Sequence, residues 1–569
     1  MLQQNNMVRG TEAMLLSLLE EGADTLFGYP GGAIMPLYDE LYRFSDHINH
    51  ILVRHEQGAV HAAQGFARAT GRTGVCLATA GPGATNLVTG IADAMLDSTP
   101  LVCVTAQVSA DKLGTNFFQE ADMINITLPI TKWNYQITRA DEIAEVMARA
   151  FYIASSGRPG PVVVSFARNA QEELVEFHYD REKFLAPLRR QARKPDAEML
   201  KRATEWLNEA KRPLILAGQG VTLSGAERAL LDIAERSNIP VATTLLGLSS
   251  FPTRHPLYMG NVGMHGHLTP NRMTQEADLI FAVGMRFSDR VTGNPQAYAP
   301  KARIIHIEID PSEIGKTIRV DLALLGDARV TLEELLNYPL EYHKREEWFA
   351  YALAQCEEES NKVVNDELHN TSAIRMAQVV DAIARLGNSD VVVTTDVGQN
   401  QMFGARYSQF RNSRSWITSG GLGTMGFGLP AAVGAKVGVP HKQVVSLVGD
   451  GGFQMNIQEL GTIMQSNIGV KIVLMNNSYL GMVRQWQELF FDHRYSFTPL
   501  ANPDFKTLVS AYGIPARRVT KIEELDDAIM ELLSTEGAAF LEVVTESEEN
   551  VFPMVPAGAP LDRILFTKP

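Results

Sequence analysis

An aspartate and an asparagine stand 27 positions apart, each at the end of an expected strand. Asp450 follows the apolar run VVSLV, Asn477 ends the segment KIVLMNN, and a helical stretch separates them. A right-handed β-α-β crossover brings such strand ends to one edge of a sheet, so the two side chains become neighbours. Their oxygens, with the amides of Gly451 and Gly452, suit a hard divalent cation that is also bound by phosphates. Alternatively, Asp450 caps the following helix and Asn476 and Asn477 form a turn.

A glutamate and a glycine-rich loop are further candidates. Glu56, in RHEQGAV, stands among apolar neighbours between an expected strand and helix. It serves there either as an acid-base group or only as a favourable acid of the first helical turn. The loop GGLGTMGFG, residues 420–428, contains G-x-G-x-x-G, which in a dinucleotide site is followed by an acidic residue about 20 positions later. Here the next strand ends in Asp450, 29 positions beyond Gly421, so the glycines favour a different ligand.

Length and composition limit the classes of function. At 569 residues the chain exceeds a single core and suggests about three domains. The net charge of −14 disfavours nucleic acid and anionic membrane surfaces, and no apolar run approaches the roughly 20 residues of a membrane span. The three cysteines lie far apart outside any C-x-x-C pair, and the N-terminus MLQQNNMVRG has no leader-like pattern. We therefore expect a cytoplasmic protein without disulfides.

Strand-like and helix-like runs alternate along nearly the whole chain, which predicts parallel sheets with helical crossovers. A charged stretch at 174–197 and a Glu- and Lys-rich, partly helical stretch at 338–371 are expected linkers. The expected domains and the proline-rich C-terminal arm are residues 7–173, 190–340, 365–545 and 546–569.

The three expected domains differ in pattern. In both outer ones a helix of small residues, AAQGFARATG or LPAAVGAKVG, leads to a strand and a glycine turn, GPGATN or GDGGFQMN. We therefore predict two copies of one fold that share a site, with chance similarity between α/β units as the alternative. In the middle domain a strand is followed along the chain by a turn with Gly218 and Gly220, a helix and further strands, which is the order of a Rossmann-like unit.

These motifs resemble those of thiamine-diphosphate enzymes. GDG at Asp450 followed by NN at Asn477 is typical of that family, and the wider match is to acetolactate synthase large subunits. The match covers nearly the whole chain, through FGYPGGAIMPLYDEL, LVRHEQGAVHAAQGFARATG, SGRPGPV, GMHG, TDVGQNQM, SGGLGTMGFGLPAA and VFPMVPAGAPL. The resemblance implies an α/β fold of three doubly wound parallel-sheet domains: pyrimidine-binding, Rossmann-like with FAD, and diphosphate-binding.

The resemblance also implies an activity. Such an enzyme decarboxylates pyruvate on thiamine diphosphate with Mg²⁺ and condenses the hydroxyethyl unit with pyruvate or 2-oxobutanoate in branched-chain amino-acid biosynthesis, while its FAD is structural. It is a homodimer or homotetramer with active sites between subunits, and relatives often bind a small regulatory subunit. One alternative is another 2-oxoacid decarboxylase, carboligase or acetyltransferase on this scaffold. A non-catalytic cofactor-binding protein is a second, and retention of Glu56, Asp450 and Asn477 argues against it.

Matching positions carry the family's roles over to this chain. By that resemblance Glu56, from the first domain, shares a proton with N1′ of the pyrimidine and meets the third domain of a partner subunit. The remaining positions are, for the substrate oxygen, Gly31, Gly32 and Gln119; for Mg²⁺, Asp450, Asn477 and the carbonyl of Tyr479; for thiamine diphosphate, Gly398, Gln399, the carbonyl of Gly423, the amide of Met425, Gly451 and Gly452; and for substrate, Phe118, Met482, Val483 and Trp486. For FAD they are Arg158, Gly218, Gly220, Thr244, Leu245, Met264, His265, Gly284, Arg286, Asp289, Arg290, Glu308, Ile309 and Asp327.

Trp486 has two interpretations. Val483, Trp486 and Phe490 are spaced by three and four positions, so on a helix they form one apolar face that suits core packing. The segment also begins just after the expected metal ligands, and the family's tryptophan here lines the pocket for the second 2-oxoacid.

Some positions depart from the family pattern. Ser288 replaces the first aspartate of RFDDR, although Asp289 and Arg290 remain. In SFARN, Ala167 and Arg168 stand in the proline and lysine places of DIPKD, near the substrate channel of relatives, and Asn400 replaces a usual histidine. The replacements bear on FAD binding, substrate access and one diphosphate contact.

Overall fold

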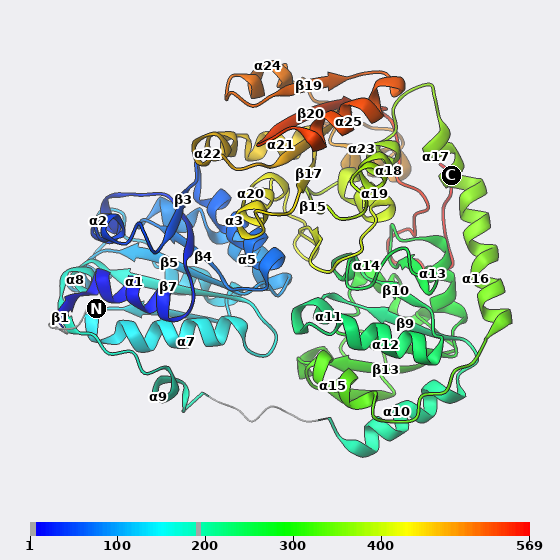
Figure 1. Cartoon of the computed structure of the whole chain (residues 1–569), viewed down its shortest axis with the longest axis horizontal. Coiled ribbons are helices and arrows are strands. Elements are labelled where there is room, and N and C mark those ends of the chain that lie inside the picture. Colours follow the sequence, from blue (N-terminus) through cyan, green and yellow to red (C-terminus); the bar gives the residue numbers. More distant parts are fainter. Residues whose placement is uncertain (1–6, 189–194, 569) are drawn as a thin grey trace.

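Each of the three domains is built on a six-stranded parallel sheet. The structure is a computed structural model that describes residues 7–188 and 195–568. Residues 1–6 of the expected N-terminal segment and 190–194, at the expected start of the middle domain, lie outside the described residues. In Figure 1 the first domain (blue to cyan) lies beside the other two, with the third (yellow to red) above the central one (green).

The first domain has the sheet order β3-β2-β4-β5-β7-β6. Its strands are β2 (Thr25–Gly28), β3 (Asn49–Leu52), β4 (Gly74–Ala78), β5 (Leu101–Gln107), β6 (Trp133–Ile137) and β7 (Pro161–Ala167), with an antiparallel pair β1 (Met7–Arg9) and β8 (Leu174–Glu176). Its helices are α1 (Gly10–Glu20), α2 (Met35–Arg43), α3 (Glu56–Thr70), α4 (Pro82–Thr85), α5 (Val88–Leu96), α6 (Met123–Thr127), α7 (Ile143–Ser155) and α8 (Arg168–Glu172), followed by α9 (Arg181–Leu185).

The central domain has the sheet order β11-β10-β9-β12-β13-β14. Its strands are β9 (Pro213–Ala217), β10 (Val241–Thr243), β11 (Tyr258–Asn261), β12 (Leu279–Val283), β13 (Arg303–Glu308) and β14 (Leu322–Leu325). Its helices are α10 (Ala197–Glu209), α11 (Gln219–Ser224), α12 (Glu227–Ser237), α13 (Leu268–Glu276), α14 (Asp289–Thr292) and α15 (Ala328–Leu335).

The third domain has the sheet order β16-β15-β17-β18-β20-β19. Its strands are β15 (Val392–Thr395), β16 (Trp416–Ile417), β17 (Val444–Gly449), β18 (Lys471–Asn476), β19 (Ala516–Val519) and β20 (Ala539–Val544). Its helices are α18 (Met376–Leu386), α19 (Gln399–Tyr407), α20 (Gly428–Gly438), α21 (Asp450–Met455), α22 (Leu460–Ser466), α23 (Gly481–Phe490), α24 (Phe505–Ser510) and α25 (Leu525–Ser534).

The two outer sheets share one topology. When the strands of each sheet are counted along the chain, both run 2-1-3-4-6-5 across the sheet, whereas the central sheet runs 3-2-1-4-5-6. The second order is that of a Rossmann domain. The structure therefore confirms the predicted repeat of one fold and the Rossmann-like middle domain.

The repeated domains pack against each other through equivalent helices, α3 and α20, which lie side by side in Figure 1. A Cβ on Gly65 of α3 would lie 2.0 Å from the carbonyl oxygen of Ala431, and one on Gly434 of α20 would lie 1.7 Å from that of Ala62. The helix backbones are thus in direct contact, which explains why small residues recur in both segments. This contact fixes the first domain on the third within one chain.

The segments expected as linkers contain helices and a strand. Between the central and third domains, α16 (Glu346–Glu359) packs on α13, and the indole of Trp348 donates to the carbonyl of Pro213 at 2.9 Å. A short π-helical turn and α17 (Asn365–His369) follow. The C-terminal arm returns to the central domain, where the amide of Val555 donates to the carbonyl of Met264 at 2.8 Å. Every helix of the described residues is too short or too polar to cross a membrane.

Candidate active site

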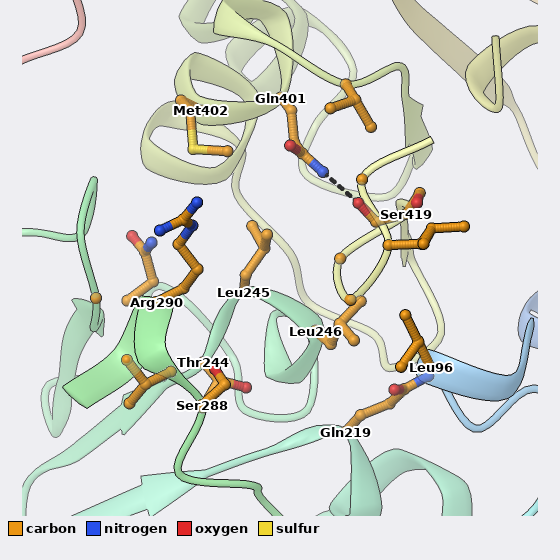
Figure 2. Close-up of a pocket in the computed structure, with 18 of the residues that line it drawn as sticks. Leu96, Gln219, Thr244, Leu245, Leu246, Ser288, Arg290, Gln401, Met402 and Ser419 are labelled. Atoms are coloured by element: carbon orange, nitrogen blue, oxygen red, sulfur yellow. Dashed lines mark hydrogen bonds between the residues drawn. The ribbon is translucent and has the colours of Figure 1, made fainter. Parts of the chain in front are cut away.

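A cavity of about 920 Å³ runs along the carboxyl ends of the strands in the central and third sheets. It lies where the strand order reverses, between β9 and β12 and between β15 and β17, and doubly wound sheets bind ligands at such points. Figure 2 shows part of its wall, which includes the side chains of Leu96, Thr244, Ser288, Gln401 and Met402. Leu96 belongs to the first domain, so all three domains of one chain line the cavity.

The oxygen-rich end of the cavity lies where β17 and β18 end as hydrogen-bonded neighbours. Asp450 directly follows β17, and Asn477 directly follows β18, as the crossover rule predicts. Burial raises the pKa of Asp450 to about 6, and the groups that oppose this rise are hydrogen-bond donors, including Asn502, rather than cations. Asn502 Nδ2 donates to Asp450 Oδ2 at 2.6 Å. A buried carboxylate beside an amide oxygen and a backbone carbonyl is a donor set for a hard divalent cation.

The N-terminus of α19 forms the adjoining wall. Gly398, which precedes it, has φ of 136°, a conformation that a side chain would strain. The first turn of a helix leaves amide groups without intrahelical partners, so this end suits a phosphate. Gln399 supports the wall, since its Nε2 donates to the carbonyl of Glu549 at 2.6 Å and its Oε1 accepts from Asn477 Nδ2 at 3.3 Å.

The glycine-rich loop crosses from β16 to α20 without forming a dinucleotide turn. β16 ends at Ile417 and α20 begins only at Gly428, so the glycines precede the helix instead of opening it. Gly423 and Gly426 have φ of 73° and 87°. Met425 lines the cavity, and a Cβ on Gly451 would lie 3.5 Å from its Cε. The predicted pyrimidine-binding positions therefore lie beside the oxygen-rich end.

The central half of the cavity has the close packing of a Rossmann turn. A Cβ on Gly218 would lie 2.3 Å from the carbonyl oxygen of Gly284, and one on Gly220 would lie 2.6 Å from Gly284 Cα. Arg158 of the first domain reaches this half, where its Nη1 is 3.3 Å from Asp310 Oδ2. All the predicted FAD-binding residues except Gly218 line the cavity.

Besides Gly218, five predicted residues lie outside this cavity: Gly31, Gly32, Glu56, Phe118 and Gln119. These five belong to the first domain. Glu56 begins α3, where Asn86 Nδ2 donates to its Oε2 at 2.9 Å. Phe118 is 82% exposed. The single chain therefore holds the predicted acid-base group apart from the predicted cofactor site.

Side chains at the positions that depart from the family pattern make contacts within the fold or line the cavity. Asn400 donates its amide hydrogens to two backbone carbonyls at 3.0 Å each, so these donors are occupied and its diphosphate contact stays a prediction. Arg168 donates to the carbonyl of Gly32 at 3.2 Å, beside the predicted substrate-oxygen turn. Ser288 lines the cavity just before the ion pair of Asp289 and Arg290, whose atoms are 3.2 Å apart.

Comparisons with known proteins agree with this architecture. Residues 8–126, 200–335 and 396–543 match the N-terminal TPP binding, central, and C-terminal TPP binding domains of thiamine pyrophosphate enzymes. The chain is 44% identical to the probable acetolactate synthase large subunit of Methanocaldococcus jannaschii, over 98% of this chain and 95% of that one. It is also 44% identical to the acetolactate synthase isozyme 2 large subunit of Escherichia coli K12, over 98% and 99%.

The chain belongs to the acetolactate synthase large subunits. The acetolactate synthase large subunit of Corynebacterium glutamicum extends the agreement, at 44% identity over 97% of this chain and 89% of the relative. The predicted family and the predicted three-domain fold are confirmed.

In this acetolactate synthase family member, α23 turns its polar face inward. Val483 and Phe490 are 47% and 43% exposed, whereas the buried residues of the helix are Arg484, Gln485 and Glu488. Arg484 donates to Glu488 Oε2 at 2.8 Å and also to backbone of the C-terminal arm. Trp486 lines the cavity. Core packing therefore does not account for the apolar spacing of this helix.

Sequence reasoning missed residues that hold the glycine-rich loop of this synthase. Asp396, directly after β15, accepts from the amides of Gly426 and Gly428 at 3.0 and 3.1 Å. Asp93 and Asp97, on and just after α5, bind the other end of the loop. One signal was available, because two acids four positions apart interrupt the otherwise apolar run GIADAML-D, and buried carboxylates need partners.

Proposed function

We propose that this chain is the catalytic subunit of an acetolactate synthase that decarboxylates pyruvate and joins the two-carbon unit to pyruvate or 2-oxobutanoate. The observation that carries the proposal is that Asp450, Asn477 and Gly423 line one cavity in a chain of this family. When bound there, thiamine diphosphate would supply the carbon nucleophile and the electron sink that decarboxylation needs. The protein's part is to bind and orient the reactants, exclude water and hold protons.

Asp450, Asn477 and the carbonyl of Tyr479 would hold Mg²⁺ together with the diphosphate. The Asp450 carboxylate is 1% exposed and its pKa is raised by burial, so a cation would offset the cost of its charge. The amide of Tyr479 donates to Asn477 Oδ1 at 3.2 Å, which orients that oxygen. The donor set supports one divalent cation that is shared with an anionic ligand.

Glu56 would act in the cavity of a second copy of the chain. Its own cavity holds the predicted cofactor residues of the third domain but neither Glu56 nor the predicted oxygen-binding residues Gly32 and Gln119. Phe117 and Phe118, beside Gln119, are 52% and 82% exposed and offer apolar surface for such a contact. A homodimer, or a tetramer of such dimers, would complete each site.

The central half of the cavity would hold FAD as a structural group. Glycines without room for a Cβ, an acidic strand end at Glu308 and the charged groups Arg158 and Arg290 form a cradle for a dinucleotide. Flavin absorbance that stays with the purified chain, and is lost with the loss of Arg158, is the expected observation. A colourless chain with full activity would remove FAD from the proposal.

The chain would also work with a smaller partner. Relatives at 44% identity carry the words "large subunit" in their names. A change in turnover or in inhibition by valine when a cognate small subunit is added would support this part of the proposal.

A product assay tests the proposed reaction directly. Purified chain should consume pyruvate and form acetolactate, and omission of thiamine diphosphate or Mg²⁺ should stop both. Acetaldehyde or acetyl phosphate as the main product would instead favour a decarboxylase or an acetyltransferase on the same scaffold. Binding of the cofactor without any turnover would favour a non-catalytic protein.

Trp486 is expected to select the acceptor. Its indole lines the cavity beside Met482 and Val483, just after the proposed metal ligands. A flat apolar side chain there can contact the methylene that 2-oxobutanoate has and pyruvate lacks, which is worth roughly 1–3 kcal/mol or about 10–200-fold in selectivity. We expect mainly acetohydroxybutanoate when both acids are offered, and a lower preference in Trp486→Leu with acetolactate formation largely intact.

The matched control for this prediction is Phe490→Leu. Phe490 lies on the same helix, with its ring 5.3 Å from that of Trp486, but does not line the cavity. Its loss should leave the product ratio unchanged. Equal use of both acceptors by the unmodified enzyme, or the same ratio in both variants, would remove Trp486 from acceptor selection.

A further inference from the structure

The segment from the end of β16 to the first residue of α20, residues 418–428 and here called the pyrimidine loop, is held by side chains of the first domain of the same chain. Asp97, which follows α5 and is 1% exposed, accepts from the amide of Gly420 at 2.9 Å and from that of Gly421 at 2.6 Å. Arg68, near the end of α3, donates to the same carboxylate at 2.8 Å and also to the carbonyl of Thr418. The buried ion pair of Arg68 and Asp97 thus holds the first residues of the loop by hydrogen bonds to their backbone.

A second carboxylate holds the middle of the pyrimidine loop. Asp93, one turn before Asp97 on α5, accepts at one oxygen from the hydroxyls of Ser419 and of Thr424, the latter at 3.0 Å. The amide of Thr424 in turn donates to Ser419 Oγ at 2.8 Å. The side chain of Asp93 is fully buried. The far end of the loop is held separately, by Asp396 of its own domain.

The start of the loop is also tightly packed, so that no side chain would fit at its first two glycines. A Cβ on Gly421 would lie 2.8 Å from Asp97 Oδ1 and 2.9 Å from Leu96 Cβ, and one on Gly420 would lie 2.7 Å from Leu246 Cγ. Figure 2 shows Leu96 and Leu246 on the same side of the cavity as Ser419. At Gly420 and Gly421 the loop therefore passes between the first and central domains without room for a side chain.

We propose that Asp93, Asp97 and Arg68 are positioning residues for thiamine diphosphate, which set the pyrimidine loop by docking the first domain on the third within one chain. This inference rests on the proposed function. The groups proposed to contact the pyrimidine, the carbonyl of Gly423 and the amide of Met425, flank Thr424, which Asp93 holds. Asp396 holds the next residue, Gly426, so anchored positions lie directly beside both groups. A glycine-rich loop has much conformational freedom to lose, and anchors that order it beforehand lower the cost of binding.

Under this proposal, different residues determine the binding of the two ends of thiamine diphosphate. The pyrimidine end depends on the anchored loop, whereas the diphosphate end depends on Asp450 and the start of α19. Loss of the Asp93 anchor should therefore weaken the binding of thiamine diphosphate but not that of inorganic pyrophosphate with Mg²⁺. Asp93→Asn removes the charge at nearly constant volume, and Thr424→Val removes one donor from the loop side.

The test measures affinities by fluorescence titration at fixed Mg²⁺, with the circular dichroism of bound thiamine diphosphate as a signature of its pyrimidine. In Asp93→Asn we expect the Kd for thiamine diphosphate to rise about tenfold or more, since the hydrogen bonds from Ser419 and Thr424 exchange a charged acceptor for a weaker neutral one. The Kd for pyrophosphate should change by less than about twofold, and the dichroism should be altered. Thr424→Val should show the same pattern. The double variant should lose less than the sum of the two single losses, because both act through one contact.

Glu40→Gln is the matched control. Glu40 is another buried carboxylate of the first domain, 2.8 Å from Arg43, and it has no contact with the pyrimidine loop. It should leave both affinities unchanged. Equal weakening of both ligands, or unchanged binding of thiamine diphosphate, in Asp93→Asn and Thr424→Val would overturn the inference. An unmodified chain that does not bind thiamine diphosphate would instead overturn the proposed function.

Discussion

Glu56→Gln should keep the affinity of the chain for thiamine diphosphate and lose most of its turnover. The amide has the shape of the carboxyl group and still offers an oxygen to Asn86, whose Nδ2 donates to Glu56 Oε2 at 2.9 Å. It cannot share and release the proton that the pyrimidine nitrogen needs. Removal of a general acid-base group costs about 10²–10⁴-fold in rate, so kcat for pyruvate consumption should fall by this amount.

Glu459→Gln provides the matched control for this variant. Glu459 is also buried near the start of α3, where the amide of Arg54 donates to its Oε1 at 3.1 Å, and it has no proposed chemical role. Its variant should retain most of the activity. Similar losses in both variants would mean that local structure, rather than proton transfer, explains the effect, and near-normal turnover in Glu56→Gln would remove Glu56 from the mechanism.

The parts of the fold that could be predicted from the sequence are those set by local patterns and by chirality. Asp450 and Asn477 lie 27 positions apart, yet the handedness of the crossover predicts that they follow neighbouring strands, and Gly449 of β17 indeed pairs with Met475 of β18. The repeat was visible as two helices of small residues. In the structure these helices pack with Gly65 against Ala431 and Gly434 against Ala62.

The contacts that could not be predicted join segments far apart in the sequence. Of the two interpretations of Val483, Trp486 and Phe490, core packing would require an inward apolar face on α23. Arg484 points inward instead, because Glu549 and Asn550 of the C-terminal arm supply its partners, each at 2.6 Å. The anchors of the pyrimidine loop likewise join positions more than 320 apart. Hydrophobic periodicity contains no information about such polar partners.

Asp450→Ala should abolish activity through the loss of Mg²⁺, with little loss of folding stability. Its carboxylate is the only anionic protein group proposed for the ion. Burial raises the pKa of Asp450 to about 6, because a charged carboxylate is costly to bury. Removal of a buried charge without a cationic partner need not destabilise a protein. Asn502, which donates to it, also donates to Asn476 Oδ1 at 3.0 Å and so keeps a partner.

Thermal unfolding and titration with Mg²⁺ and thiamine diphosphate check the Asp450→Ala prediction together. The melting temperature without ligands should match that of the unmodified chain, and the stabilisation that ligands add to the unmodified chain should be absent. Asp450→Asn, which keeps an oxygen ligand but not the charge, should bind more weakly than the unmodified chain and more tightly than the alanine variant. Wild-type binding by Asp450→Ala at any Mg²⁺ concentration would make the metal assignment wrong.

Mixing the Glu56→Gln and Asp450→Ala variants can show whether Glu56 acts in the cavity of its own chain or in that of a second copy. If Glu56 acts in a second copy, a mixed dimer of Glu56→Gln and Asp450→Ala chains has one site with both substitutions and one site with neither. Random assembly of equal amounts should then restore roughly a quarter of the unmodified activity, far above that of either variant alone. If Glu56 acts in the cavity of its own chain, every site carries one substitution and mixing restores nothing. The separation of Glu56 from the cavity within one chain favours the first result.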